Sequence, residues 1–250
     1  GAWQKAVPLA AGLELIHNFS LIHDDIEDMS PTRRHRPAVW TRWGVAQAIN
    51  TGDAIFSLAR LAVHRLAAEG TPAEIVLAVL ERVEATSLAL CRGQYLDMAF
   101  EGQERVSLDS YMQMIEGKTA ALLACAAETG ALVGAGFGGP HAAMRRFGLE
   151  LGFAFQIVDD ILGIWGDPRV TGKPAADDVR SRKKTFPILH ALEVLEARGE
   201  KELARLLARP EMSEDDVAAA IRHIEAAGAR EEAERLAEEH TARGLAALEE

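Results

Sequence analysis

The stretch LIHDDIEDMSPTRRHRP, residues 21–37, places four acidic side chains at the end of an apolar run and three arginines just beyond them. The acids are Asp24, Asp25, Glu27 and Asp28, and the arginines are Arg33, Arg34 and Arg36. Ser30 and Pro31 lie between the two groups and predict the end of a helix. Neither group suits a buried core. Together they indicate a site for a ligand that carries both a metal ion and negative charge.

Asp24 and Asp28 are four residues apart, so on a helix their side chains share one face. Like charges at this spacing repel each other unless a cation compensates them. Magnesium favours hard oxygen ligands, usually one or two carboxylates together with substrate phosphates and water. Taken alone, this stretch fits either a magnesium site or a helix end whose acidic side chains are simply solvated.

A second stretch, FAFQIVDDILGIWGDPRVTGKPAADDVRSRKKTFP at residues 153–187, repeats this order of features. An apolar segment ends at Asp159 and Asp160, a break follows, and cations come next. The cations are Lys173, Lys183 and Lys184. If both segments are helices and face each other, they enclose a cavity with acidic and basic side chains around its mouth. Such a cavity would bind a diphosphate bridged by magnesium ions above a pocket for an apolar tail.

Helical periodicity dominates the chain of 250 residues, and no run of alternating β-branched residues appears. Breakers rich in Gly and Pro separate the helical segments. Thr71 and Ser213 have the residue types of helix N-caps. We therefore expect an all-α single domain, residues 1–250, built from long helices around a common core. The expected helices cover residues 5–28, 45–69, 72–100, 107–135, 139–165, 185–208, 213–227 and 229–249.

The formal net charge of −11 makes nucleic acid an unfavourable partner for the surface as a whole, so a phosphate site must be a local basic pocket. Cys91 and Cys125 lack metal-ligand spacing, and we expect both to be buried thiols in a reducing cytoplasm. No signal-peptide pattern opens the chain. The longest apolar run, residues 119–127, is too short to span a bilayer, so we expect no membrane insertion.

Four motifs in order along residues 8–192 resemble those of the trans-type isoprenyl diphosphate synthases, the polyprenyl synthetase family. A single Asp-Asp pair is weak support, whereas four ordered motifs at this spacing are specific. The motifs are Asp24-Asp25-Ile26-Glu27-Asp28 with Arg33-Arg34, then Gly93-Gln94-Tyr95-Leu96-Asp97, then Gly117-Lys118-Thr119, and finally Gln156-Ile157-Val158-Asp159-Asp160 with Gly172-Lys173 and Lys183.

The resemblance implies an isoprenoid synthase fold and the condensation of isopentenyl diphosphate with an allylic prenyl diphosphate. It implies that Asp24, Asp28 and Asp159 hold three magnesium ions on the allylic diphosphate. It also implies that this diphosphate contacts Arg33, Lys118 and Lys173. A homodimer is the expected assembly, with packing surface on the helix near residues 119–135.

The resemblance assigns further residues to the substrates. Arg34 would help to bind isopentenyl diphosphate, and Lys183 would close over the site, unless Lys183 is an ordinary surface lysine. Thr119 and Gln156 would line the path of the carbocation. Gln94 fits either a substrate contact or a core hydrogen bond.

Two features depart from the family pattern. Gly163 stands where the second motif usually has a third aspartate, and we expect weaker metal support from that side. An early Gly-Gly-Lys-x-x-Arg-Pro element that binds isopentenyl diphosphate has no counterpart before Asp24. Because the chain opens within a helical pattern, we expect that N-terminal helices of the family domain precede this sequence.

Product length in the family depends on bulk one turn or slightly more before the first acidic motif. Here Ser20 lies four residues before Asp24, and Phe19 lies five before it. A small residue four positions before the motif, with an aromatic residue five positions before it, resembles the pattern in synthases of the twenty-carbon product. We therefore expect geranylgeranyl diphosphate, with farnesyl diphosphate as the second choice.

Two other functions fit parts of the sequence. A class I terpene cyclase ionises the same diphosphates with the same metal chemistry, but it has no need of the Arg33-Arg34 pair or of Lys118-Thr119. A non-catalytic subunit of a heteromeric prenyl synthase usually loses its first acidic motif, which is intact here.

Overall fold

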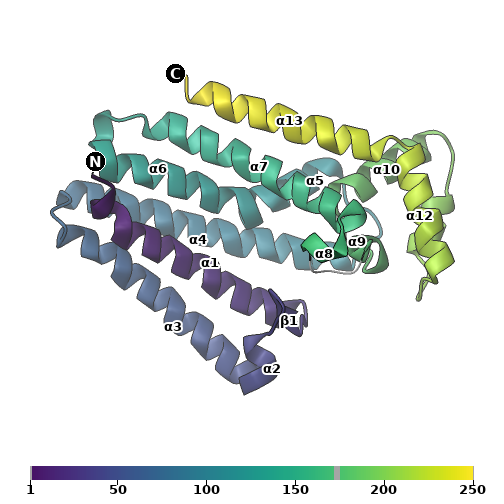
Figure 1. Ribbon diagram of the computed structural model, residues 1–250, viewed down its shortest axis with the longest axis horizontal. Helices are drawn as coiled ribbons and strands as arrows, with labels where there is room; N and C mark the ends of the chain where they lie inside the picture. Colours follow the sequence, from purple (N-terminus) through teal and green to yellow (C-terminus); the bar gives the residue numbers. More distant parts are fainter. Residues whose placement is uncertain (1, 172–174, 250) are drawn as a thin grey trace.

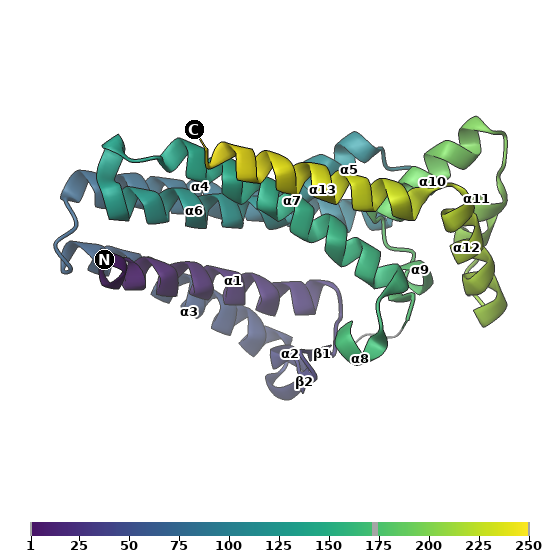
Figure 2. The same cartoon turned by 45° about the horizontal axis from the view of Figure 1, so that its top comes forward.

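The computed structural model describes residues 2–171 and 175–249 and shows long helices that run side by side (Figure 1). The described part of the chain begins with a short 3-10 turn, Ala2–Ala6. The helices α1 (Val7–Glu27) and α3 (Val45–His64) then form an antiparallel pair. Figure 2 shows this pair as a separate layer beneath the other long helices. The other helices are α2 (Val39–Trp43), α4 (Ala73–Glu101), α5 (Leu108–Ile115), α6 (Ala121–Ala135), α7 (His141–Trp165), α8 (Pro168–Thr171), α9 (Asp177–Arg180), α10 (Phe186–Ala197), α11 (Glu202–Leu207), α12 (Glu214–Ala226) and α13 (Ala229–Ala247).

The only strands in the described part of the chain are β1 (Thr32–Arg33) and β2 (Arg36–Pro37), which pair antiparallel in a hairpin between α1 and α2. Shorter helical turns cover Arg65–Ala67, Glu116–Ala120 and Gly136–Gly138. The all-α class predicted from the periodicity is therefore confirmed.

Three groups of buried apolar side chains hold the helices together. One joins α1, α3, α4 and α6 around Leu9, Val63 and Leu132. A second joins α5, α7, α10 and α13 around Tyr111 and Ile157, and a third lies beneath α9–α12. Figure 1 shows that α1 and α7 run in the same direction and finish at the same end of the molecule, so the packed helices bring both acidic segments to that end.

Helix ends mostly follow the predicted breakers. α1 stops at Glu27 because Met29 adopts a left-handed φ of 51° and Pro31 follows. Ser213 caps α12 in a reciprocal capping box, as expected. The cap predicted at Thr71 is wrong, since Pro72 occupies that position and the Thr71 hydroxyl makes no such bond.

Two expected helices differ from the prediction. Residues 185–208 form two helices, α10 and α11, because Gly199 takes a φ of 78° between them. Residues 107–135 form a continuous helical run, but it contains a π-helical turn at Glu116–Ala120. The regular 3.6-residue period does not reveal either change.

One helical stretch, Leu108–Gly138, has the length and composition to cross a membrane, with a mean hydropathy of 1.6. The apolar run of residues 119–127 is part of this longer stretch, because the helix continues on both sides of it. Its central part, α6, packs against α4 and α7 (Figure 1).

Candidate active site

The end of α1 presents Asp24 and Asp28 to a cavity with a volume of about 920 Å³. Burial and the neighbouring Asp24 carboxylate raise the pKa of Asp28 to about 6. Asp25 differs from both, since it is buried at 3% exposure and does not line the cavity. The three aspartates of the first motif therefore have two distinct environments.

A strained hairpin folds Arg33 back onto these acids. Arg33 Nη2 donates to Asp24 Oδ2 at 2.8 Å, and Arg33 Nε donates to Asp25 Oδ1 at 2.6 Å. The turn between the strands consists of Arg34 and His35, whose φ values of 51° and 61° are both left-handed. Such backbone costs about 1–3 kcal/mol per residue without glycine and tends to occur at functional sites. The turn brings both of its side chains to the rim of the cavity.

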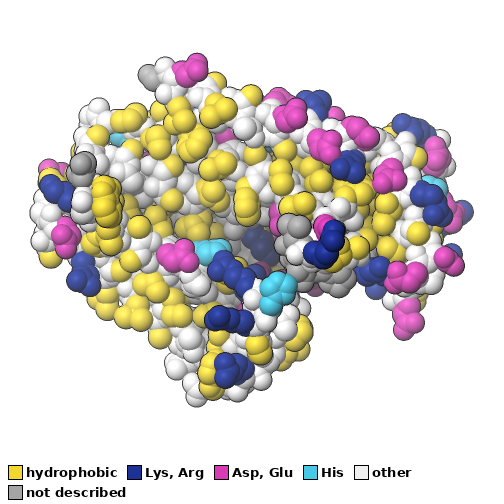
Figure 3. Space-filling model, viewed as in Figure 1, with side chains coloured by type: hydrophobic (Ala, Val, Ile, Leu, Met, Phe, Trp, Pro, Cys, Tyr) yellow, Lys and Arg dark blue, Asp and Glu magenta, His cyan; other side chains and the backbone are white. Residues whose placement is uncertain are grey.

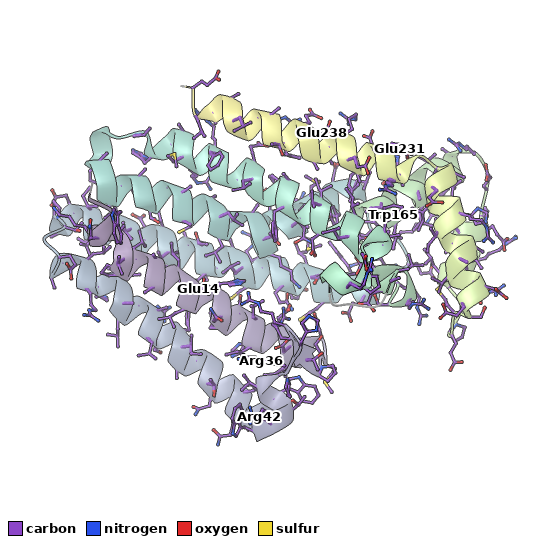
Figure 4. The ribbon with its side chains drawn as sticks, viewed as in Figure 1. Glu14, Arg36, Arg42, Trp165, Glu231 and Glu238 are labelled. Atoms are coloured by element: carbon purple, nitrogen blue, oxygen red, sulfur yellow. The ribbon has the colours of Figure 1, made fainter. Side chains whose placement is uncertain are left out.

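The two arginines of the paired motif thus have different surroundings. Arg33 is engaged by two carboxylates, whereas Arg34 is exposed at the rim and makes no hydrogen bond or ion pair among the described residues. Arg36, labelled in Figure 4, is exposed on β2 and does not line the cavity. Arg34 is therefore free to receive an anion that Arg33 cannot reach without leaving its partners.

Lys118 projects from the π-helical turn and joins two walls of the cavity. Its Nζ lies 3.1 Å from Asp24 Oδ1 and 2.5 Å from Asp97 Oδ2 on α4. The turn can approach α4 because Gly93 and Gly117 face each other; a Cβ on Gly93 would lie 2.1 Å from the Lys118 backbone nitrogen. Single π-helical turns inside α-helices often mark functional sites.

A chain of hydrogen bonds leads from the cavity into the core. Thr119 Oγ1 donates to Gln156 Oε1 at 2.7 Å, and Gln156 Nε2 donates to Asp160 Oδ1 at 3.0 Å. Asp160 also accepts from Tyr111 Oη at 2.5 Å and from the Phe186 backbone N–H at 2.9 Å. Burial raises the pKa of Asp160 to about 6, although these donors favour its charged form.

Asp159 lines the cavity on the side opposite α1, one residue before the buried Asp160. Lys183 lines it too. Burial lowers the pKa of the Lys183 ammonium, but the carboxylates around it, with Asp178 and Asp97 first, raise that pKa above its ordinary value overall. The Lys183 side chain is exposed to solvent, and it contributes a positive charge to the lining of the cavity. Lys173 lies outside the described residues.

The cavity continues from its charged mouth into an apolar region. Phe19 and Ser20 line it one turn before Asp24, together with Leu90, Leu122 and Phe155. The rings of Phe19 and Phe56 pack with centroids 4.6 Å apart, so α3 supports α1 at this depth. Figure 3 shows a hollow in this face with basic and histidine side chains around it.

Other predicted residues have partners that the sequence did not reveal. Gln94 Nε2 donates to Glu27 Oε2 at 2.7 Å on the cavity wall, so it does not serve a core hydrogen bond. Cys91 is exposed, contrary to the expected burial, while Cys125 is buried. Asp97, the partner of Lys118, was not singled out, although the Gly93–Asp97 motif contains it. No sequence signal distinguishes Tyr111.

The carboxylates at the mouth suit magnesium shared with a ligand. No group of three or more His, Cys, Asp or Glu side chains in the described residues is assembled for a metal by itself. Asp24, Asp28 and Asp159 instead present hard oxygens from two sides of one cavity, as magnesium shared with phosphates requires. Burial and the Asp24 carboxylate raise the pKa of Asp28, and the Lys118 and Lys183 ammonium groups offset this only in part.

The fold and the two acid-bearing helix ends define a helical isoprenoid synthase, and comparison with known proteins gives the family. The family model described as polyprenyl synthetase matches residues 1–224, and the chain belongs to this family. It is 43% identical to the geranylgeranyl diphosphate synthase of Mycobacterium tuberculosis over 97% of this chain and 68% of that protein. It is 42% identical to a (2E,6E)-farnesyl diphosphate synthase of the same species, over 96% of this chain and 67% of that protein.

Solved structures agree. A geranylgeranyl pyrophosphate synthetase from Pyrococcus horikoshii superposes with a TM-score of 0.91 at 36% identity, over 100% of this chain and 75% of that chain. A polyprenyl synthetase from Streptomyces coelicolor gives a TM-score of 0.89 at 39% identity, over 98% and 73% respectively. These neighbours confirm the expected isoprenoid synthase fold.

Proposed function

We propose that this chain is a prenyltransferase that condenses isopentenyl diphosphate with an allylic prenyl diphosphate, with geranylgeranyl diphosphate as its main product. The observation that carries the proposal is one cavity with Asp24 and Asp28 on one wall, Asp159 on the other, and an apolar floor beyond them. The named relatives, which are geranylgeranyl and farnesyl diphosphate synthases, support the same reaction.

In the proposed reaction, the bond between C1 and oxygen of the allylic diphosphate breaks and pyrophosphate leaves with the electron pair. The double bond of isopentenyl diphosphate then forms a new carbon–carbon bond to C1. The resulting cation loses a proton from the adjacent carbon, and the departing pyrophosphate accepts it. Asp24, Asp28 and Asp159 would hold magnesium, which would supply positive charge to the diphosphate and make it a better leaving group.

The chain's own cations stabilise the charge that grows on the leaving group. Lys118, Arg33 and Lys183 surround the mouth, and fixed cations there favour the transition state over the ground state. Lys173 has the same proposed role from its motif. Gln156 and Thr119 present oxygen dipoles along the path of the carbocation, and their mutual hydrogen bond holds them in place. Arg34 binds the second diphosphate at the rim.

We further propose a homodimer in the cytoplasm. Exposed leucines on α3 and α4 support the dimer better than the helix near residues 119–135 does. These are Leu58, Leu61, Leu77 and Leu88, whose exposed fractions are 53%, 62%, 67% and 68%. The two free thiols suit a reducing compartment.

An incubation with magnesium and each allylic primer, with and without isopentenyl diphosphate, tests the function. The expected result is a twenty-carbon prenyl diphosphate that forms only when isopentenyl diphosphate is present. Hydrocarbon or alcohol formed from the primer alone would indicate a terpene cyclase instead. No product from the full-length protein would indicate a non-catalytic subunit.

A further inference from the structure

A buried carboxylate lies where the second acidic motif has none. Gly163 follows Asp159 by one helical turn on α7, in place of the third aspartate. A Cβ atom on Gly163 would lie 2.0 Å from Oδ2 and 2.5 Å from Cγ of Asp178. The carboxylate of Asp178, which belongs to α9, therefore fills the space that a side chain at position 163 would need.

Packing fixes the position of Asp178. The residue is 6% exposed, and its neighbours Ala176 and Val179 belong to the same buried group as Ile164 of α7. Figures 1 and 2 both place α9 beside the end of α7. The contact between Asp178 and Gly163 is thus part of the core between the two helices.

Asp178 is also linked to the charged side of the cavity. The Lys183 backbone N–H donates to the Asp178 carbonyl oxygen at 2.9 Å, which closes the turn after α9. The Lys183 side chain lines the cavity together with Asp159. The negative charge of the Asp178 carboxylate favours the charged form of the Lys183 ammonium.

We propose that Asp178 supplies, from α9, the carboxylate that α7 lacks at Gly163, and that it positions Lys183 and the magnesium-bound diphosphate on the Asp159 side of the cavity. This inference rests on the proposed function. The sequence predicts weaker metal support because Gly163 has no carboxylate. In the proposed arrangement the carboxylate comes from Asp178 on α9, and the missing side chain of Gly163 leaves space for it.

Affinity for inorganic pyrophosphate in the presence of magnesium, measured by calorimetry, tests the proposal without requiring turnover. Asp178→Asn keeps the size of the side chain but removes its charge. We expect it to weaken pyrophosphate binding, and to raise the magnesium concentration that gives half-maximal turnover, by about tenfold to a hundredfold. Asp177→Asn on the same helix is the matched control and should leave both quantities unchanged.

A rescue experiment tests whether the side chains at positions 163 and 178 compete for the same space, and distinguishes this from a general loss of structure. Gly163→Asp alone should also weaken pyrophosphate binding, because its side chain collides with Asp178. Combining Gly163→Asp with Asp178→Ala should recover much of the affinity that Asp178→Ala loses. If Asp178→Asn does not fold, Gly163→Ala provides the same test, because it displaces the carboxylate without removing it.

Magnesium-dependent pyrophosphate binding by folded Asp178→Asn at the wild-type affinity would overturn the inference. A double variant no better than Asp178→Ala would do the same for the exchange with Gly163. If the wild-type protein binds pyrophosphate with magnesium but forms no prenyl product, the proposed function fails while the role of Asp178 can still be judged from binding.

Discussion

Lys118 and Asp24 are 94 positions apart in the sequence, yet Lys118 Nζ lies 3.1 Å from Asp24 Oδ1. The same ammonium contacts Asp97 at 2.5 Å, and Asp24 also accepts from Arg33. Two cations proposed to hold the diphosphate, Arg33 and Lys118, therefore pair with Asp24, an acid proposed to hold magnesium. Binding of the magnesium diphosphate would exchange these internal ion pairs for contacts with the substrate.

Lys118→Ala should lower kcat on the order of a hundredfold to a thousandfold, with a smaller change in KM for the allylic substrate. The reason is that its charge faces negative charge that grows as the carbon–oxygen bond breaks. Steady-state kinetics at saturating magnesium measures both constants. A variant that changes only KM would show that Lys118 contributes uniform binding and no selective stabilisation of the transition state.

Arg34→Ala should raise KM for isopentenyl diphosphate by about tenfold to a hundredfold, which corresponds to one lost charge-assisted hydrogen bond. Its kcat should change little. Arg36→Ala is the matched control, because Arg36 belongs to the same hairpin but does not line the cavity. An effect on the allylic substrate alone would reverse the proposed roles of Arg33 and Arg34.

Product length should respond to the floor formed by Phe19 and Ser20. Phe19→Ala removes a ring that packs on Phe56 and should lengthen the products, whereas Ser20→Phe should shorten them. Chromatography of the dephosphorylated products measures both effects. Unchanged lengths in both variants would place the floor on another helix.

Tyr111→Phe should lower the free energy of unfolding by about 1–3 kcal/mol, because it leaves the buried Asp160 carboxylate without one donor. Denaturant unfolding monitored by circular dichroism gives this value. Tyr95→Phe is the control, since Tyr95 is 71% exposed and its stability should match the wild type. Equal stability of Tyr111→Phe would mean that the hydroxyl does not support Asp160.

Much of the fold could be predicted from the sequence, because apolar periodicity and Gly or Pro breakers specify long helices locally. The bounds of α1, α4 and α7 follow directly from such signals. The hairpin after α1 could not be predicted, since its turn uses Arg34 and His35 where left-handed backbone usually calls for glycine or asparagine. The hydrogen bonds from Arg33 to Asp24 and Asp25 depend on that turn.

The candidate site shows the same division. Asp24, Asp28, Asp159 and Lys118 could be named because motifs mark them, and all four line one cavity. The different environments of Asp24 and Asp25 could not be foreseen, because Arg33 and the core create them. The space at Gly163 is likewise defined by Asp178, a residue of another helix, so only tertiary structure reveals it.

The most direct test of the central claim is incorporation of labelled isopentenyl diphosphate by the wild type, Asp24→Asn and Asp159→Asn. The control is Asp215→Asn, because Asp215 is an exposed residue of α12. We expect the wild type and the control to form prenyl diphosphate at equal rates. Each of the other two should lose on the order of a thousandfold in rate while keeping its helical circular dichroism. Rates near that of the wild type in either variant would contradict the claim that both acidic helix ends act together on one diphosphate.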